Sequence, residues 1–287
     1  MTPQTETDLK VWPAPAKLNL FLHITGRRSD GYHELQTLFQ ILDWGDDLYL
    51  LVNDDGDISR ASDIEGVPEE RDICMRAAHL LKARTGVKQG VQIDLLKRIP
   101  VGAGLGGGSS DAATVLCALN ELWACGLTRT ELAGLGLELG ADVPVFIYGH
   151  SALGEGRGEK LQNVSLGQRN YLLVFPDINI STADVFRQPS LKRNSTPLDL
   201  KRHGLQPGRN DCESVIYLMY PQLKNVVRDL SEWGQPHMSG TGSTFFLSFD
   251  DKKAAKRAAR ELECRYNVRP VEGVDRSKLL DKLSEEM

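Results

Sequence analysis

Five glycines crowd into residues 100–110, between an alternating apolar stretch and a helical pattern. Gly102, Gly104 and the run 106–108 leave backbone N–H groups uncovered by side chains. A bare backbone of this kind lets an anion approach the main chain closely. The helix predicted next adds its unpaired N–H groups and the positive end of its dipole. The segment therefore predicts an anion cradle, and a nucleotide phosphate is the anion we expect.

Spacing predicts the elements on both sides of this loop. Apolar residues recur at three- and four-residue intervals from Ala112 to Trp123, and Ser109 and Ser110 are typical N-cap residues. Upstream, residues 91–96 alternate well enough for a strand. The glycine run therefore joins a strand to a helix, which is where phosphate-binding loops are found.

Two known phosphate loops fit poorly. The P-loop pattern needs a lysine before the hydroxyl residues, and Gly108 stands there. Gly102, Gly104 and Gly107 match the spacing of a dinucleotide fingerprint, but that fold needs a second strand ending in an acidic residue. Residues 130–139 indicate a further helix instead. A flexible glycine turn without a ligand remains the plain alternative.

Length and composition set the class of protein. A chain of 287 residues favours two domains, and we place them at 1–165 and 166–287. The net charge of −5 argues against a nucleic-acid partner, and no apolar run is long enough to span a membrane. The five cysteines form no C-x-x-C pair, the histidines lack metal-ligand spacing, and the N-terminus has no apolar core. We therefore expect a cytoplasmic protein with reduced thiols.

Other segments are assigned from the same patterns. Residues 15–24 alternate as a strand with Lys17 and Asn19 on its polar face, and residues 140–146, which contain Asp142, read as a tight entry to a second apolar strand. Residues 187–209 are read as a solvated surface loop or a mobile lid. The remaining predictions are a helix at 72–85, a strand at 170–176, a helix capped by Asn210 and Asp211 and running to Met219, a helix at 221–230, a glycine turn at 238–243 feeding a strand to 249, and a helix at 252–264.

Three pieces together suggest phosphoryl transfer. That chemistry needs a phosphate cradle, a cation for the transferring charge and a carboxylate for the attacking hydroxyl. Residues 104–110, Lys17 and Asp142 supply these in turn, and residues 239–243 form a second glycine turn. Each piece alone is weak, because a strand lysine is usually a surface charge and an aspartate of this kind often only forms a turn.

The motifs resemble those of a known family in their order along nearly the whole chain. The stretches APAKLNL at 14–20, GLGGGSS at 104–110 and SGTGS at 239–243 resemble the three motifs of the galactokinase–homoserine–mevalonate–phosphomevalonate (GHMP) kinase superfamily. RSDGYHEL at 28–35 and GADVP at 140–144 are similar to one branch of it, which phosphorylates a diphosphocytidyl methylerythritol on the non-mevalonate route to isoprenoids. The resemblance implies a two-domain α+β fold, with an N-terminal domain of the ribosomal protein S5 type and a ferredoxin-like C-terminal domain.

The resemblance also implies a reaction and residue roles. ATP with Mg²⁺ would phosphorylate the tertiary 2-hydroxyl of the substrate; Asp142 would orient that hydroxyl and take its proton, and Lys17 would stabilise the moving phosphoryl charge. The ATP site would consist of Lys97, Pro100, Gly102, Gly104, Leu105, Gly106, Gly107, Gly108, Ser109 and Ser110. The substrate site would consist of Asn19, Tyr32, His33, Thr182, Phe186, Gly240, Thr241 and Gly242.

Within that substrate site, Tyr32 and Phe186 would sandwich the cytosine and His33 would read its polar edge; packing in the core is the other interpretation of Phe186. One departure concerns the adenine side, where Asp72 stands in place of the family's usual asparagine and cannot donate as an amide does. No magnesium carboxylate is assigned. We expect a small-molecule substrate, no nucleic-acid or membrane partner, and a monomer or weak homodimer.

Three alternatives stay open at this point. A GHMP-type kinase could act on another small alcohol, such as mevalonate or homoserine, although an aromatic residue beside a histidine at Tyr32 and His33 suits a nucleobase better. A nucleotide sensor without activity has no need of Lys17 and Asp142 together. A dinucleotide-binding oxidoreductase lacks its second strand.

Overall fold

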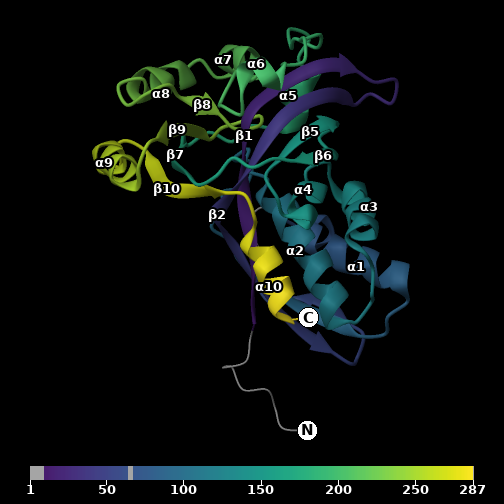
Figure 1. Ribbon diagram of the computed structural model, residues 1–287. Helices are drawn as coiled ribbons and strands as arrows, with labels where there is room; N and C mark the ends of the chain where they lie inside the picture. The colour runs from purple at the N-terminus through teal and green to yellow at the C-terminus, as the bar shows by residue number, and fades with distance from the viewer. Residues whose placement is uncertain (1–9, 64–66, 287) are drawn as a thin grey trace.

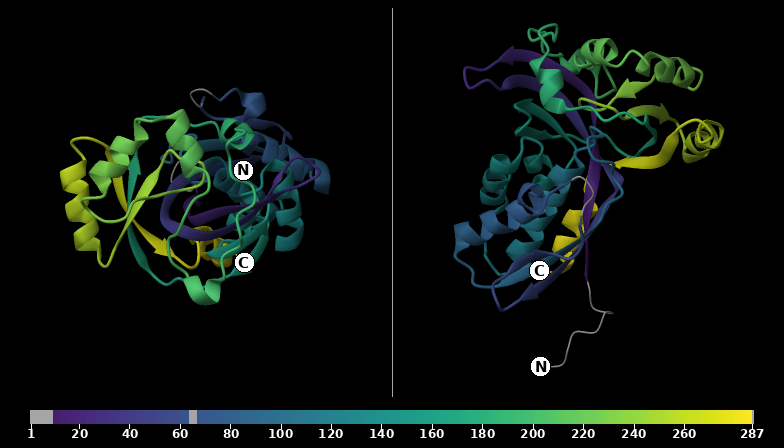
Figure 2. Two further views of the ribbon diagram at one scale, coloured as in Figure 1. Left: turned by 90° about the horizontal axis from the view of Figure 1, so that it is seen from above. Right: turned by 180° about the vertical axis from the view of Figure 1, so that it is seen from behind.

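Two long antiparallel strands, β1 (Val11–Arg27) and β2 (His33–Asn53), run from one end of the molecule to the other (Figures 1 and 2). The computed structural model describes residues 10–63 and 67–286. β1 contains the strand expected at 15–24 and extends past both of its ends. The hairpin matters for the site because Lys17 and Asn19 of β1 line the cavity described below.

A single mixed sheet continues through both halves of the protein. Its main order is β3-β4-β2-β10-β7-β9-β8, while β1 and β5 also pair with β2, and β6 pairs with β5. The further strands are β3 (Ile58–Arg60), β4 (Gly90–Leu96), β5 (Ala152–Gly156), β6 (Lys160–Asn163), β7 (Arg169–Phe175), β8 (His237–Met238), β9 (Phe245–Phe249) and β10 (Asn267–Val274).

The first half packs helices against β1, β2 and β4. Their buried side chains form one apolar cluster that includes Trp12, Leu116 and Phe146. The last helix of the chain returns to this cluster through Leu279 and Leu283, as its place beside β1 in Figure 1 shows. These helices are α1 (Ile73–Thr85), α2 (Gly107–Leu122), α3 (Arg129–Leu139), α4 (Val143–Tyr148) and α10 (Lys278–Glu286).

The second half has its own apolar cluster between the strands β7 and β9 and a set of helices. It also includes Leu22 and Ile24, so the far end of β1 belongs to it. A third cluster, around Leu20, Leu105 and Phe246, lies between the two halves. The helices of the second cluster are α5 (Thr182–Arg187), α7 (Glu213–Met219), α8 (Leu223–Leu230) and α9 (Lys252–Leu262), while Leu200 of α6 (Leu200–His203) packs against the third.

Three local expectations are wrong. Residues 143–148 form the helix α4 rather than a strand; a short apolar run does not distinguish the two, and proline is tolerated in a first helical turn. α2 begins at Gly107 with Gly106 as its N-cap, so the serines lie inside its first turn. The N-cap of α7 is Cys212, while the Asp211 carboxylate accepts instead from Ile24 N (2.8 Å).

The mixed α+β architecture in two halves is confirmed. Residues 187–209, left open between a surface loop and a lid, include α6 and a buried Leu191, and Leu198 N donates to the Gln36 side chain (2.7 Å). The division near residue 165 stays a prediction. No helix in residues 10–63 and 67–286 has the length and apolar character needed to cross a bilayer.

The packing around α2 generates a first prediction. Leu116→Ala, at a fully buried position of α2, should lower the free energy of unfolding by about 2–5 kcal/mol through lost burial and a new cavity. Leu218→Ala is a matched control, because that leucine on α7 is 68% exposed and should change stability by less than about 0.5 kcal/mol. Urea unfolding of both variants measures the difference, and equal losses would contradict this description of the core.

Candidate active site

A cavity of about 930 Å³ lies where the two halves meet. It receives side chains from β1, the glycine loop before α2, the segment before α4, and α5. Of the residues predicted for the site, Ser110 and Gly242 do not lie on its wall; all the others do. Segments far apart in the sequence are therefore brought together around one cavity.

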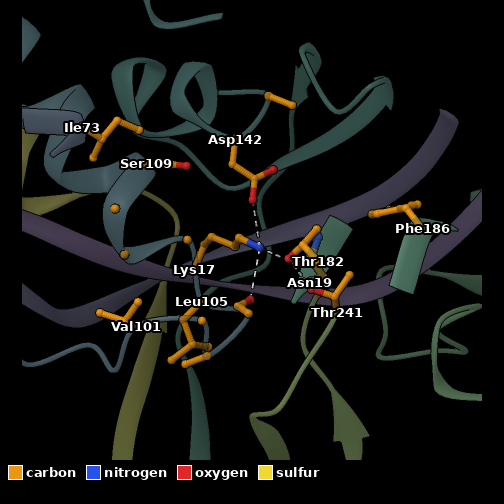
Figure 3. A pocket seen from close by; sticks show the side chains of 18 of the residues that line it. Lys17, Asn19, Ile73, Val101, Leu105, Ser109, Asp142, Thr182, Phe186 and Thr241 are labelled. Carbon is orange, nitrogen blue, oxygen red and sulfur yellow. Dashed lines mark hydrogen bonds and ion pairs between the residues drawn. The ribbon is translucent and has the colours of Figure 1, made fainter. Parts of the chain in front are cut away.

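Lys17 occupies the middle of this cavity (Figure 3). Its ammonium donates to Asn19 Oδ1 (2.5 Å) and to Gly104 O (3.3 Å), and it forms an ion pair with Asp142 Oδ2 (3.2 Å). The Lys17 side chain is 3% exposed, whereas that of Asp142 is 34% exposed. The carboxylate is thus the member of the pair that a bound ligand can reach.

The orientation of Asn19 is set by neighbours on β1 and β2. Its Nδ2 donates to Thr37 Oγ1 (2.8 Å), and that hydroxyl donates to Phe21 O (2.6 Å). With the amide nitrogen used in this way, Oδ1 faces Lys17. Asn19 is therefore held as an acceptor for the ammonium rather than as a donor.

The two glycine loops touch each other beside Lys17. Ser239 Oγ donates to Gly104 O (2.9 Å) and accepts from Asn19 N (3.1 Å), so it joins both loops to β1. A Cβ on Gly104 would lie 2.3 Å from Ser239 O, and one on Gly240 would lie 3.0 Å from Gly104 O. Because Gly104 also has a φ of +75°, this close approach needs glycine.

The start of α2 presents an open helix N-terminus to the cavity. Gly106 precedes it with a φ of +72°, and a Cβ there would meet both the Phe146 ring and the Lys17 stem. The first backbone bond into the helix runs from Ser110 N to Gly106 O (2.9 Å), which leaves the N–H groups of residues 107–109 in the unpaired first turn. The sixteen-residue helix therefore directs its positive end at the cavity.

One end of the cavity is apolar and lies at α1. Ile73 and Val101 lie on one side of Lys17 in Figure 3, and Leu95 also lines this end. Asp72 is the N-cap of α1: it accepts from Cys74 N (2.8 Å) and pairs with Arg60 (3.3 Å). Both carboxylate oxygens are engaged within the protein, which explains an acid at this position without any contact to a base.

Lys97 belongs to a buried charge cluster that the sequence did not reveal. Its ammonium bonds to Asp46 Oδ2 (2.5 Å) and Asp111 Oδ2 (2.7 Å). Asp46 also accepts from the backbone N–H groups of Arg98 (2.5 Å) and Ile99 (2.7 Å). The sequence offers one signal for this cluster, which is that Asp111 directly follows the two serines of the glycine loop. Nothing in the sequence connects Asp46 to the loop.

The Asp111 carboxyl has an unusual environment. It is 2% exposed, and its Oδ1 has no hydrogen-bond partner among the described residues. Burial raises the pKa of Asp111 to about 8; the negative charge of Asp46 also raises it, and Lys97 opposes both. Burial therefore favours the protonated form of this carboxyl far more than it does for an exposed aspartate.

The other end of the cavity is aromatic and positively charged. The Phe186 ring packs on His33 with centroids 4.9 Å apart, and the Arg157 guanidinium lies 4.3 Å from the Tyr32 ring centre. Thr182 Oγ1 bonds to Thr241 Oγ1 (2.8 Å), which joins α5 to the second glycine loop. The cations lining this end are Arg27, Arg157, Arg187 and Arg193.

The fold and the two interlocked glycine loops define a GHMP kinase. Residues 72–150 match the family described as GHMP kinases N terminal domain, and residues 193–268 match GHMP kinases C terminal. Solved structures with the same fold include a homoserine kinase from Cytophaga hutchinsonii, at 17% identity and a TM-score of 0.68, covering 96% of this chain and 98% of that one. At that identity the likeness concerns the fold alone.

Closer relatives share one description. The 4-diphosphocytidyl-2-C-methyl-D-erythritol kinase of Halorhodospira halophila is 48% identical over 97% of this chain and 98% of its own; that of Burkholderia mallei is 46% identical over 96% and 97%. A crystal structure of a 4-(cytidine 5'-diphospho)-2C-methyl-D-erythritol kinase has 34% identity and a TM-score of 0.79, covering 92% of this chain and all of that one. The chain belongs to the 4-diphosphocytidyl-2-C-methyl-D-erythritol kinase family, and it is an enzyme.

The contact between the glycine loops generates a second prediction. Gly104→Ala should abolish measurable ATP-dependent turnover, because its Cβ collides with Ser239 O at 2.3 Å. Gly126→Ala is a matched control with a φ of +70° and nothing within 4 Å of its Cβ. Both variants pay about 1–2 kcal/mol of backbone strain. Turnover and melting temperature should separate them, and an active Gly104→Ala enzyme would contradict the interlocked geometry.

The buried cluster generates a third prediction. In the unfolded chain Asp111 ionises near about pH 4, whereas the folded protein keeps its proton until about pH 8, so stability is lost as pH rises between those values. Asp111→Asn removes that loss, so its stability relative to the native protein should rise by on the order of a few kcal/mol from acid to alkaline pH.

Urea unfolding at about pH 5 and about pH 8.5 measures this difference. Asp46→Asn is the contrasting variant, because Asp46 accepts two backbone N–H groups and should be needed at both pH values. A pH-independent difference between Asp111→Asn and the native protein would contradict a protonated Asp111.

Proposed function

We propose that this protein transfers the γ-phosphoryl group of ATP to the 2-hydroxyl of 4-diphosphocytidyl-2-C-methyl-D-erythritol, giving the 2-phosphate and ADP in the non-mevalonate isoprenoid pathway. One observation carries the proposal: the Lys17–Asp142 pair lies between a helix N-terminus and an aromatic, cationic end of the same cavity. A phosphoryl donor and a cytidylyl alcohol can occupy its two ends and meet at the pair.

ATP would occupy the α1 end. The unpaired N–H groups of residues 107–109 would receive its phosphates, and Ile73 and Val101 would contact the adenine. Lys97 faces this end, although its ammonium is already bonded to Asp46 and Asp111. Lys97 would therefore hold the glycine loop in place through these two ion pairs and would also lie near the adenine.

Lys17 and Asp142 would carry the chemistry. Asp142 is reachable from the cavity and would orient the 2-hydroxyl and accept its proton. Lys17 is held by Asn19 and Gly104 O, so its charge is already in place to stabilise the transferring phosphoryl group. A tertiary alcohol is a crowded nucleophile, so placing it correctly should account for much of the rate.

The diphosphocytidyl end of the substrate would lie among Tyr32, His33 and Phe186. The arginines that line this end would offset the charge of the diphosphate. Asn19, Thr182 and the loop 240–242 would contact the methylerythritol and its phosphates. The bond between Thr182 and Thr241 would hold that loop against the substrate.

Magnesium is proposed with ATP. No group of three or more His, Cys, Asp or Glu side chains in the described residues is placed to hold a metal ion, but hydroxyl and phosphate oxygens suit Mg²⁺. Ser109 lies on the cavity wall near Asp142 in Figure 3 and would add its hydroxyl to the phosphate oxygens. Bound there, the ion would supply neutralisation of phosphate charge. Ser110 is fully buried and does not fit this role.

A kinase for another small alcohol is the second candidate, and the His33–Phe186 pair argues against it, since mevalonate and homoserine have no base to stack there. Release of ADP with ATP and Mg²⁺ should be measured with the cytidylyl substrate, mevalonate, homoserine and galactose. We expect turnover only with the first. Turnover with another alcohol would overturn the substrate assignment. The expected cytoplasmic location and monomer or weak homodimer stay predictions.

The catalytic assignment generates a fourth prediction. Asp142→Asn and Lys17→Met should each lower kcat by at least about a hundredfold, because each removes a group acting on the reacting atoms. Asp142→Asn also removes the negative charge that pairs with the buried Lys17 ammonium, so some loss of stability is expected and kcat is compared well below the melting temperature of each variant. Lys256→Met, an exposed lysine on α9, is the control and should keep full activity. Near-native kcat in either catalytic variant would refute the assignment.

A further inference from the structure

His33 begins β2 at the aromatic end of the cavity, and Arg193 holds it from the segment after α5. Arg193 Nε donates to His33 Nε2 (3.0 Å). A second contact is with Phe186, whose ring lies at an interplanar angle of 32° to the imidazole. His33 is thus contacted at its Nε2 edge by a guanidinium and on its face by an aromatic ring, and both come from one short stretch of chain.

The guanidinium is itself fixed by backbone carbonyls. Its Nη1 donates to Leu191 O (2.9 Å), and its Nη2 donates to Phe186 O (2.8 Å) and Gln188 O (2.8 Å). These bonds tie the end of α5 and the following turn around one planar group. Arg193 therefore sets the position of Phe186 as well as that of His33.

The direction of the Arg193–His33 bond determines where the imidazole proton is. An arginine guanidinium is always protonated and can only donate, so His33 Nε2 must be the acceptor. A neutral imidazole carries one N–H, which is then on Nδ1. Burial lowers the pKa of His33, and the positive charges of Arg193 and Arg27 lower it further, so the ring stays neutral.

Nδ1 is the nitrogen left for a ligand. Within the part of the chain that the structure describes, no protein atom forms a hydrogen bond with His33 Nδ1, and this nitrogen is accessible rather than enclosed. His33 lines the cavity. A histidine with the proton on Nδ1 is a hydrogen-bond donor at that position. It matches the acceptor atoms on the edge of a cytosine ring.

We propose that Arg193 is a positioning residue that sets substrate specificity, by holding neutral His33 with its proton on Nδ1 as a donor to an acceptor-bearing pyrimidine edge. The proposal rests on the function proposed above. It goes beyond that function because Arg193 acts through His33 and Phe186 rather than by its charge alone.

The first test is the state of the ring itself. Nitrogen-15 NMR of the histidine side chains, with His33→Gln to assign the signal, should show the Nδ1–H form of His33 in the free enzyme. Arg193→Met removes the donor and should shift the ring toward the Nε2–H form. An Nε2–H ring in the native enzyme would overturn the proposal, whatever the enzyme phosphorylates.

The second test separates substrate binding from the rest of catalysis. Arg193→Met should raise KM for the cytidylyl substrate by about ten- to a hundredfold and leave KM for ATP and kcat nearly unchanged. In a His33→Gln background the same substitution should raise KM less, because the part of its effect that acts through His33 is gone and only the part that acts through Phe186 remains. An equal effect in both backgrounds, or a matching rise in KM for ATP, would overturn the proposal.

Two further variants control for charge and folding. Arg193→Gln places an amide nitrogen at the same number of bonds from Cα as Nε, so it should retain the Nδ1–H ring and give an intermediate KM. Arg202→Met removes an exposed charge from the same segment and should behave as the native enzyme. If the native protein does not phosphorylate the cytidylyl substrate, the proposed function is wrong. The NMR experiment still tests whether Arg193 sets the tautomer of His33.

Discussion

The buried ammonium of Lys17 is the group on which the arrangement of the site depends. A charge that is 3% exposed is costly unless it is fully paired, and here Asp142, Asn19 Oδ1 and Gly104 O surround it. Each partner comes from a different part of the chain: the start of α4, β1 itself and the first glycine loop. The requirement to pair one charge therefore brings together the elements that a phosphoryl transfer needs.

The same requirement links the two halves of the protein. Ser239 bonds to both Asn19 N and Gly104 O, so the glycine loop of the second half is part of the support for Lys17. Asn210 Nδ2 also holds that loop, because it donates hydrogen bonds to Met238 O (3.0 Å) and Gly240 O (2.6 Å). A ligand that contacts either glycine loop therefore meets a loop held in place by several connected hydrogen bonds. This preorganisation suits a reaction limited by placing a crowded hydroxyl.

Much of this site was predictable because its signals are local. A glycine run before a helix, a lysine on a polar strand face and a second glycine turn are legible in short windows, and their order matches a family. What could not be predicted depends on contacts across long separations: Asp46 lies 51 residues from Lys97, and Arg193 lies 160 residues from His33. Asp46 and Arg193 look like ordinary surface charges in the sequence. The contacts that bury Asp46, and the contact of Arg193 with His33, appear only when the sheet is formed.

The fold shows the same division between local and long-range information. The helix α2 and the strand β1 follow from periodicity, whereas the pattern predicts a strand where α4 forms, because a six-residue apolar run fits a helix or a strand equally well. β10 and α10 were not assigned at all, and their packing against β2, β7, β1 and α2 decides their place. Short elements of this kind take their conformation from tertiary contacts more than from their own sequence.

The most direct test of the central claim is a crystal structure with the cytidylyl substrate and an ATP analogue whose terminal phosphate cannot transfer. The account predicts the terminal phosphate between Lys17 and the start of α2, with the 2-hydroxyl within about 3 Å of the Asp142 carboxylate. A terminal phosphate away from Lys17, or a 2-hydroxyl out of reach of Asp142, would contradict it.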